Sequence, residues 1–551
     1  MKIKILAYLA AFTIQVSSKE FIINNKPLHI GVSITFATRS HIKYLLEILE
    51  DVSKKGHHVT YLSMNEMKSF GNGYNVTHYS LGDVKMTFSK VEESKPYTRG
   101  DSMFKNPKEM RQDLGSLYKA SFPVYEKFYR EEKPDLMVCD FNAEACVESA
   151  AKNSIPMVIG YQSLMFSYSS PFLTGNGVLQ STTIENFTFL QRMKHAFYDP
   201  INMLMQALPI VDLVQEERKL QDIPPIYKFP VFADMGIGIA NSYIGLENPR
   251  NVPSHVYPIG PILSGDISSL PEELQHFMDS HSKVLYVAFG SLVKLPNDML
   301  PKLLQHFQRA INGGVLDGVV WGLPKNNIEL LPKSYKIDDV EYYSDKIVKG
   351  THGKIKILKW APQQSILNHP STKLFLSHGG LESIYESMNA GVPMLILPFF
   401  SDQPRNAMLV TENGVGDYIE WNTTSDDQIY HKFTKLLDPN NLELKSKVRQ
   451  MQLITKFSSK RKAMAANLIE TYALSAKSCR QFSTPKPFKS PCEVLPFLPL
   501  DKRMSPFKAN LYDVYLTGIV ILGLALFAIG YFIYLLFKKA SNAFYPKQKQ
   551  E

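Results

Sequence analysis

The residues most suggestive of chemistry are grouped in one stretch of the chain, residues 360–403. It combines an aromatic side chain, a His-Gly-Gly turn, and carboxylate and amide groups at fixed offsets; it reads WAPQQSILNHPSTKLFLSHGGLESIYESMNAGVPMLILPFFSDQ. The spacing predicts a buried strand (372–377), a tight turn (378–380), a helix (381–389) that Gly391 ends, and a further strand (394–398). These groups are the ones needed to hold a nucleoside diphosphate and an attached sugar.

The turn at Gly379 and Gly380 leads directly into the predicted helix. Unpaired backbone N–H groups and the positive end of the helix dipole gather at such a helix N-terminus, and they attract a diphosphate. Two glycines before a helix also fit ordinary packing of a strand against a helix, so the turn alone leaves both interpretations open. The order of the whole segment favours phosphate binding.

This ordered string resembles the donor-binding signature of the UDP-glycosyltransferase family, which includes the glucuronosyl- and glucosyltransferases of small lipophilic compounds. Carried over to this chain, the resemblance implies three contacts with the nucleoside. Trp360 would stack on uracil, because an aromatic face suits a planar base, and Gln363 would hydrogen-bond the nucleoside. Glu386 would accept hydrogen bonds from both ribose hydroxyls, since a carboxylate suits a vicinal diol.

The same resemblance implies contacts with the diphosphate and the sugar. Four residues would meet the diphosphate: Ser291, His378, Ser383 and the backbone of Gly380. Asp402 and Gln403 would bind the sugar hydroxyls, and this pair occurs with both glucose and glucuronic acid. No acidic Asp-x-Asp motif is placed for the diphosphate, so neither a metal nor a cofactor is expected, and the UDP-sugar is a co-substrate.

One position departs from the family pattern. The family often has Asn or a small residue where this chain has Glu382, two positions after the second glycine. A carboxylate pointing inward at about 4 Å from a diphosphate would repel it by roughly 1–4 kcal/mol. Glu382 is therefore expected to face outward or to be held by a cation, and its role stays open.

The first half of the chain opens with a strand–helix–strand pattern: a strand at 28–34, a helix at 42–55 ended by Gly56, and a strand at 58–62. Such a βαβ unit implies a parallel sheet with ligands at the carboxyl ends of its strands. Two polar residues stand at this edge. His41 lies in the loop after the first strand, and Asp140 ends another strand, 135–139, before a helix at 142–152.

His41 and Asp140 each have an ordinary interpretation. Taken alone, His41 is a surface or capping residue, and Asp140 is the N-cap of the helix that follows it. In the family that this chain resembles, a histidine in this loop is the general base, and a carboxylate orients it. The resemblance implies that His41 takes a proton from the acceptor hydroxyl, while Asp140 fixes the imidazole tautomer and stabilises the imidazolium.

The resemblance covers nearly all of residues 28–537 and also implies an α/β architecture called GT-B, in which two Rossmann-like domains face each other across a cleft, here with a C-terminal transmembrane helix. The expected divisions are a signal peptide (1–18), an acceptor-binding domain (19–260), a UDP-sugar-binding domain (261–480), a juxtamembrane segment (481–513), a transmembrane helix (514–537) and a cytosolic tail (538–551). A Pro-rich run at 248–271 fits an interdomain linker. Residues 187–214, rich in Phe, Met and Leu, would cover the acceptor pocket, lie on the membrane surface or form core helices.

The two ends of the chain carry targeting patterns. Residues 1–18 have a basic start, an apolar stretch and small residues at the end, as a secretory signal peptide has. Residues 514–537 contain no charge and are long enough to cross the ~30 Å hydrocarbon core, and two lysines follow them on the expected cytosolic side. Lys547 and Lys549 have the spacing of a dilysine retention signal. The expected location is the endoplasmic reticulum membrane, as a single-pass type I glycoprotein with lumenal catalytic domains.

The formal charge of the 551-residue chain is +9, which raises the question of nucleic-acid binding. Much of the excess lies in the two terminal segments, and the body between them is only mildly basic. No nucleic-acid partner is expected; the expected partners are a UDP-sugar, a small lipophilic acceptor and the membrane. A homo-oligomer stays open.

Cysteines and glycosylation sequons bear on the compartment. Four cysteines are too few for a disulfide scaffold. Cys139 and Cys146, in a strand and the helix after it, are expected to be buried free thiols, whereas Cys479 and Cys492 could pair in an oxidising lumen. Sequons begin at three positions, which fit lumenal exposure: Asn75, Asn186 and Asn422.

Together with the resemblance, the sequence predicts inverting transfer of glucuronic acid or glucose from a UDP-sugar to a hydroxyl of a small lipophilic acceptor. Two alternatives stay open. One is a transferase dedicated to a single membrane lipid, such as a sterol or ceramide. The other is a non-catalytic UDP-sugar or lipid binder in which Glu382 has spoiled the donor geometry. The acceptor itself cannot be read from variable apolar loops.

Overall fold

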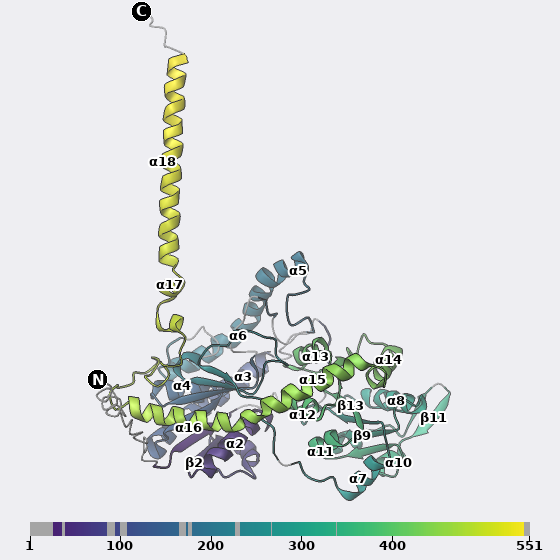
Figure 1. Ribbon diagram of the computed structural model, residues 1–551. Coiled ribbons are helices and arrows are strands. Elements are labelled where there is room, and N and C mark those ends of the chain that lie inside the picture. The colour runs from purple at the N-terminus through teal and green to yellow at the C-terminus, as the bar shows by residue number, and fades with distance from the viewer. Residues whose placement is uncertain are drawn as a thin grey trace, which may run out of the picture.

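The structure is a computed structural model that describes residues 26–35, 39–84, 94–99, 107–164, 172–174, 179–225, 232–265, 267–337 and 339–544. The predicted signal peptide and the two lysines of the predicted retention signal lie outside these residues. Figure 1 shows two α/β domains side by side, from which one long helix, α18 (Tyr512–Phe544), projects.

The first domain is built on a seven-stranded parallel sheet in the order β3-β2-β1-β4-β5-β6-β7. Its strands are β1 (His29–Ser33), β2 (His58–Ser63), β3 (Thr77–Ser80), β4 (Leu136–Asp140), β5 (Met157–Tyr161), β6 (Ile237–Ala240) and β7 (Val256–Pro258). Helical segments of this domain are α2 (Arg39–Lys54), η1 (Asn65–Gly71), α3 (Pro107–Glu132), α4 (Glu144–Lys152), α5 (Phe189–Met193), η4 (Lys194–Tyr198), α6 (Asp199–Leu220) and η5 (Ala233–Met235). Both faces of the sheet are covered: Val138 lies in the core beneath α2, and Met137 lies in the core beneath α3.

The second domain repeats this plan with a six-stranded parallel sheet in the order β12-β9-β8-β13-β14-β15. Its strands are β8 (Val284–Ala288), β9 (Gly318–Gly322), β12 (Ile355–Leu358), β13 (Thr372–Ser377), β14 (Met394–Ile396) and β15 (Gly416–Tyr418), with a hairpin of β10 (Ser334–Ile337) and β11 (Val340–Tyr343). Its helices are α7 (Glu272–Asp279), α8 (Met299–Asn312), α9 (Lys325–Ile328), α10 (Asp345–Val348), α11 (Gln363–Asn368), α12 (Leu381–Ala390), α13 (Gln403–Glu412), α14 (Asp426–Leu437) and α15 (Leu442–Ser458).

The chain then returns to the first domain through η6 (Ser459–Arg461) and α16 (Lys462–Cys479), which run on from α15 in Figure 1. Ile469 and Tyr472 are fully buried in the core beneath α2, together with Val494. Lys462 Nζ lies 3.0 Å from Glu47 Oε2 of α2. The predicted second domain, 261–480, therefore differs from the structure at its end, because α16 completes the core of the first domain.

The cysteines correct one expectation. Cys139 and Cys146, expected as free thiols, form a disulfide with their Cα atoms 5.8 Å apart. The expectation was wrong because α4 folds back onto the end of β4, and both side chains enter the same core. Cys479 and Cys492 also form a disulfide, which joins the end of α16 to the segment that carries Val494.

Two short helical segments, η7 (Leu500–Arg503) and α17 (Pro506–Ala509), lead into α18. Within the described part of the chain, α18 is the helix that is long and apolar enough to cross a membrane: Tyr512–Ser541 has a mean hydropathy of 2.6 and is not buried against the rest of the protein. This range includes the span predicted at 514–537.

Candidate active site

The carboxyl ends of β1 and β4 bring two predicted site residues together. These strands are neighbours in the sheet; His41 lies in the first turn of α2 after β1, and Asp140 is the last residue of β4. His41 Nδ1 lies 3.3 Å from Asp140 Oδ2. The Asp140 side chain is fully buried, whereas 23% of the His41 side chain is exposed. The carboxylate of Asp140 thus lies on the buried side of the His41 ring.

The second oxygen of Asp140 has a separate partner. Asp140 Oδ1 accepts a hydrogen bond from the backbone N–H of Asn142 (3.0 Å). The following helix, α4, has Ala143 as its N-cap, so Asp140 does not cap it. Gln162 Nε2 donates to the backbone oxygen of His41 (2.9 Å) and holds the start of α2 in place. Asp140 therefore combines a structural contact with one that faces the ring.

The predicted nucleoside contacts lie at the carboxyl edge of the second sheet. Gln363 Nε2 donates to Glu386 Oε2 (2.7 Å) and to Ser383 Oγ (3.1 Å), and Gln364 Nε2 donates to Glu386 Oε1 (2.8 Å). Burial and the neighbouring Glu382 raise the pKa of Glu386. Trp360, after β12, leaves 80% of its surface exposed, as a stacking platform requires.

The predicted diphosphate seat is built on a histidine between two glycines. Gly380 is the N-cap of α12, and a Cβ there would lie 2.5 Å from His378 Nε2; a Cβ at Gly290 would lie 2.8 Å from the same atom. Glycine is therefore required on both sides of the ring. Burial lowers the pKa of His378 to about 4, and a contact with the Ala288 backbone opposes this shift only partly. The Nδ1 atom of His378 has no partner in hydrogen-bond geometry. Ser291, just after Gly290, is exposed.

The predicted sugar contacts begin α13. Asp402 is its N-cap, and Asn406 Nδ2 donates to Asp402 Oδ2 (2.7 Å) and to the Gly379 carbonyl (2.9 Å). Burial raises the pKa of Asp402, while Asn406, His41 and other neighbours oppose the shift. Gln403 Oε1 accepts from the backbone N–H groups of Phe399 (2.8 Å) and Phe400 (3.2 Å), so its carbonyl shapes the loop and its amide N–H₂ faces away from that contact.

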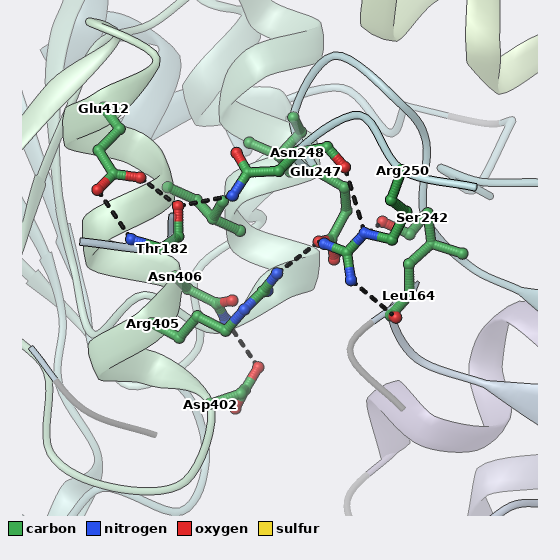
Figure 2. Close-up of polar contacts among 12 residues, drawn as sticks. Leu164, Thr182, Ser242, Glu247, Asn248, Arg250, Asp402, Arg405, Asn406 and Glu412 are labelled. Atoms are coloured by element: carbon green, nitrogen blue, oxygen red, sulfur yellow. Dashed lines mark hydrogen bonds and ion pairs between the residues drawn. The ribbon is translucent and has the colours of Figure 1, made fainter. Parts of the chain in front are cut away.

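Figure 2 shows how α13 is tied to loops of the first domain. Arg405 Nη2 and Arg250 Nη2 both donate to Glu247 Oε2, at 2.6 and 3.1 Å. Burial alone would raise the pKa of Glu247, but the two guanidinium groups hold it below its usual value. At the other end of α13, Glu412 accepts from the backbone N–H of Thr182 (2.9 Å) and from its hydroxyl. The helix that carries Asp402 is thus fixed at both ends.

Glu382 is held by a cation, as one of its two expected arrangements requires. The cation is Lys43 of α2, whose Nζ also lies 3.9 Å from Glu386 Oε1. Burial would lower the pKa of Lys43, but the two carboxylates outweigh burial and raise it. Lys43 and Arg405 were not singled out from the sequence. The unpaired charge of Glu382 was the signal that could have led to Lys43.

Comparison with known proteins bears on this site and fold. The family model described as "UDP-glucoronosyl and UDP-glucosyl transferase" matches residues 177–454. A UDP-glycosyltransferase 1 of Phaeomoniella chlamydospora is 30% identical over 410 residues, which are 72% of this chain and 80% of that protein. A 2-hydroxyacylsphingosine 1-beta-galactosyltransferase of Rattus norvegicus is 28% identical over 283 residues, 50% of this chain and 47% of that protein.

Solved structures show the fold. Phytolacca americana UGT2, complexed with UDP-2fluoro-glucose and pterostilbene, superposes with a TM-score of 0.55 at 17% identity, over 81% of this chain and 100% of that one. The calicheamicin glycosyltransferase CalG4 gives 0.55 at 17% identity, over 81% and 98%. The fold is that of the GT-B glycosyltransferases. The chain belongs to the UDP-glucuronosyl and UDP-glucosyl transferase family, and its reaction is glycosyl transfer from a UDP-sugar.

Proposed function

We propose that the chain transfers a hexosyl group to a hydroxyl of a small lipophilic acceptor, with inversion at the anomeric carbon. The observation that carries this proposal is the 3.3 Å approach of His41 Nδ1 to the buried carboxylate of Asp140. His41 Nε2 takes the hydroxyl proton as the acceptor oxygen attacks from the face opposite UDP. Asp140 stabilises the imidazolium that forms.

On the donor side, the leaving UDP carries a growing negative charge. The N-terminus of α12, which begins after Gly380, directs unpaired N–H groups toward that charge, and Ser383 adds a hydroxyl. His378 takes part as a neutral ring, since its pKa is about 4. Glu386 receives the ribose hydroxyls after Gln363 and Gln364 have oriented it.

A second candidate is a transferase dedicated to one membrane lipid. Two observations favour it over a general transferase of soluble compounds: the similarity to the rat galactosyltransferase of 2-hydroxyacylsphingosine, and the apolar helix α18. The alternative of a non-catalytic UDP-sugar or lipid binder rested on the charge of Glu382, and Lys43 compensates that charge. Glucose and glucuronic acid both stay open as the transferred sugar.

We further propose the endoplasmic reticulum membrane as the location, with the two α/β domains in the lumen. The apolar span of α18, the lysines after it and the disulfides support this orientation.

The test combines a substrate panel with one variant. The full chain in detergent or nanodiscs is given UDP-glucose, UDP-glucuronic acid and UDP-galactose with a phenol, a sterol or a ceramide, and UDP release and product are measured. His41→Ala should lower turnover by at least about 10²-fold with UDP affinity nearly unchanged, because the base lies outside the donor site. His58→Ala, an exposed histidine at the start of β2, serves as the control. Turnover within tenfold of the wild type would contradict the role of His41.

A further inference from the structure

Residues 189–205 form an arm that stands away from the first domain. It comprises α5, η4 and the first part of α6, and its large apolar side chains are exposed to solvent: Phe189, Leu190, Met193, Phe197, Tyr198, Ile201, Leu204 and Met205. The exposed fraction reaches 77% for Leu190 and 63% for Phe197. The surface of a soluble monomeric protein rarely carries so many neighbouring apolar side chains. This patch therefore indicates that another protein or a membrane covers it.

The arm has a defined helix start and is anchored to the first domain by a buried ion pair. Thr188 and Gln191 form a capping box at the start of α5, so the tip has a defined helix start. At the base, Arg218 Nε of α6 donates to Glu148 Oε1 of α4 (2.8 Å), and both side chains are almost fully buried. The base of the arm is therefore well packed, and the exposed apolar side chains are not explained by a loose attachment to the domain.

The direction of the arm identifies what covers it. In Figure 1 the arm and α18 leave the body on the same side, and α5 reaches about as far along the axis of α18 as the start of that helix. A membrane crossed by α18 would meet the arm at its surface. Arg192 and Lys194 lie among the apolar residues of the tip, as in helices that rest at the headgroup level.

We propose that the arm lies in the surface of the membrane that α18 crosses, with its apolar side chains among the acyl chains. This choice resolves the alternatives left open for residues 187–214 in favour of the membrane surface. If the proposed function is correct, a lipophilic acceptor dissolved in the bilayer meets the first domain without crossing water.

Tryptophan scanning tests the arm directly and requires no transfer activity, so it can fail or succeed independently of the proposed function. The full chain with Phe197→Trp or Leu190→Trp is reconstituted in nanodiscs that contain ordinary or brominated lipid. The matched control is Tyr343→Trp on β11, which is equally exposed (63%) but lies in the second domain. The chain already contains Trp321, Trp360 and Trp421, so the emission of the introduced indole is obtained as the difference between variant and wild type. This difference emission should lie to the blue and be quenched by bromine in the arm variants alone.

Two outcomes would overturn the arm proposal. Emission typical of water at both arm positions would mean that the arm does not touch lipid. A blue shift without bromine quenching, dependent on protein concentration, would mean that a second copy of the chain covers the arm.

An independent observation concerns donor binding. Lys43 lies two residues after His41 on α2, and its ammonium is paired with Glu382 in the first turn of α12. Two-thirds of the Glu382 side chain is buried, on the helix whose N-terminus faces the diphosphate. We propose that Lys43 is a positioning residue for the donor: it neutralises Glu382, so that the second domain can accept the negative charge of UDP.

Charge and shape are separated by three variants of the full chain. Lys43→Met keeps the aliphatic stem and removes the charge, Glu382→Gln removes the opposite charge, and the third variant carries both changes. Lys43→Met should weaken UDP binding by at least about tenfold, since the unpaired carboxylate repels the diphosphate, and this loss should shrink at high salt. The double variant should recover to within about threefold of the wild type. Uridine, which has no phosphate, should lose much less affinity than UDP, although Lys43 also lies 3.9 Å from Glu386, the predicted ribose contact.

Calorimetry with UDP and uridine measures these affinities, and neither ligand requires the acceptor or the base. Equal weakening of UDP and uridine would overturn the proposal, since Lys43 would then act through the fold or through Glu386 and not through the diphosphate. A double variant as weak as Lys43→Met would mean that Lys43 binds phosphate itself. Should Lys43→Met not fold, exchange of the two charges by Lys43→Glu with Glu382→Lys replaces it, and failure of that exchange to bind UDP would equally overturn the proposal.

Discussion

At the scale of residues, two histidines of the site have opposite environments. His41 is partly exposed and faces a buried carboxylate, so a proton gained by its ring would be compensated. His378 lies in the second domain with its pKa lowered to about 4, and it stays neutral near pH 7. A neutral imidazole can donate one hydrogen bond to a phosphate oxygen but supplies no charge. These environments fit the proposed roles, which are proton transfer for His41 and ligand contact for His378.

Asp140→Asn should lower turnover by at least about 10²-fold, because the imidazolium of His41 loses its counter-charge. The amide can still accept from the N–H of Asn142, so the melting temperature should change little. Steady-state rates and thermal unfolding measure the two effects. Asp135→Asn, just before the other end of β4, is the matched control and should keep its rate. A normal rate with a lower melting temperature would limit Asp140 to its structural contact.

His378→Gln should make the free energy of unfolding fall less steeply as the pH is lowered from 6.5 to 4. In the folded protein, burial lowers the pKa of His378 to about 4, from its usual value of 6.5. Between pH 6.5 and 4 the unfolded chain therefore binds one proton more, and this group lowers the stability by up to about 1.4 kcal/mol per pH unit as the pH falls. Denaturation midpoints of both proteins over this range measure the difference. Parallel curves would contradict the lowered pKa.

The positions of the site residues could be predicted where each follows a strand and belongs to one continuous motif, as from Trp360 to Gln403. Residues that act across the domains could not. Lys43 is separated from Glu382 by 339 positions, and Arg405 from Glu247 by 158. Local spacing carries no information about such pairs. Only the anomaly at Glu382 indicated that a cation was needed.

At the scale of elements, α13 positions the predicted sugar contacts, because its first turn follows Asp402 and its two ends are tied to the first domain. Arg405 and Glu247 are almost fully buried, so the loss of one partner leaves a charge without compensation in the interior. The position of the predicted sugar contacts therefore depends on the ion pair between Arg405 and Glu247.

Arg405→Met should lower the free energy of unfolding by about 3 kcal/mol and raise the KM for the UDP-sugar. Arg250 remains to compensate part of the charge of Glu247, so the protein should still fold. Adding Glu247→Gln should recover much of the stability. Arg449→Met, an exposed arginine on α15, is the control. Denaturant unfolding and donor kinetics measure both effects. Unchanged values for Arg405→Met would show that α13 is fixed without this pair.

Several of the central strands could be predicted from apolar runs bounded by turns, and β13 was placed without error at 372–377. The surroundings of the arm could not be predicted from the sequence. A helix that packs in a core and a helix that lies in a membrane surface can have the same apolar composition. The disulfide of Cys139 and Cys146 was missed for a related reason. Periodicity predicted that both residues are buried but not that a strand end and a helix start lie face to face.

At the scale of the whole molecule, contacts at several places hold the domains together. Lys43 pairs with Glu382, Arg405 pairs with Glu247, and Glu412 accepts from Thr182. The segment 94–99 adds a backbone contact, in which the N–H of Tyr97 donates to the Pro398 carbonyl (2.8 Å). The proposed base and the predicted donor contacts are therefore kept in one arrangement by both side chains and backbone.

Glycan occupancy should report how the molecule sits on the membrane. The three sequon asparagines are exposed, but Asn186 lies just before the start of the arm, whereas Asn75 and Asn422 lie elsewhere on the two domains. If the arm rests in the bilayer surface, glycans should occur on Asn75 and Asn422 and not on Asn186, because a side chain among lipids is shielded from the transferring enzyme. Glycopeptide mass spectrometry measures this. A glycan on Asn186 would contradict the arm proposal, and bare Asn75 and Asn422 would contradict the lumenal location.

The return of α16 to the first domain also determines the order in which the chain can fold as it leaves the ribosome. Ile469, Tyr472 and Val494 complete the core beneath α2, yet they are synthesised after the entire second domain. Until they emerge, the first domain has all the strands of its sheet but presents an open apolar face. Its maturation must therefore wait for the end of translation, and the disulfide between Cys479 and Cys492 is formed among the last steps. A stop codon before α16 would damage the first domain while leaving its sheet sequence complete.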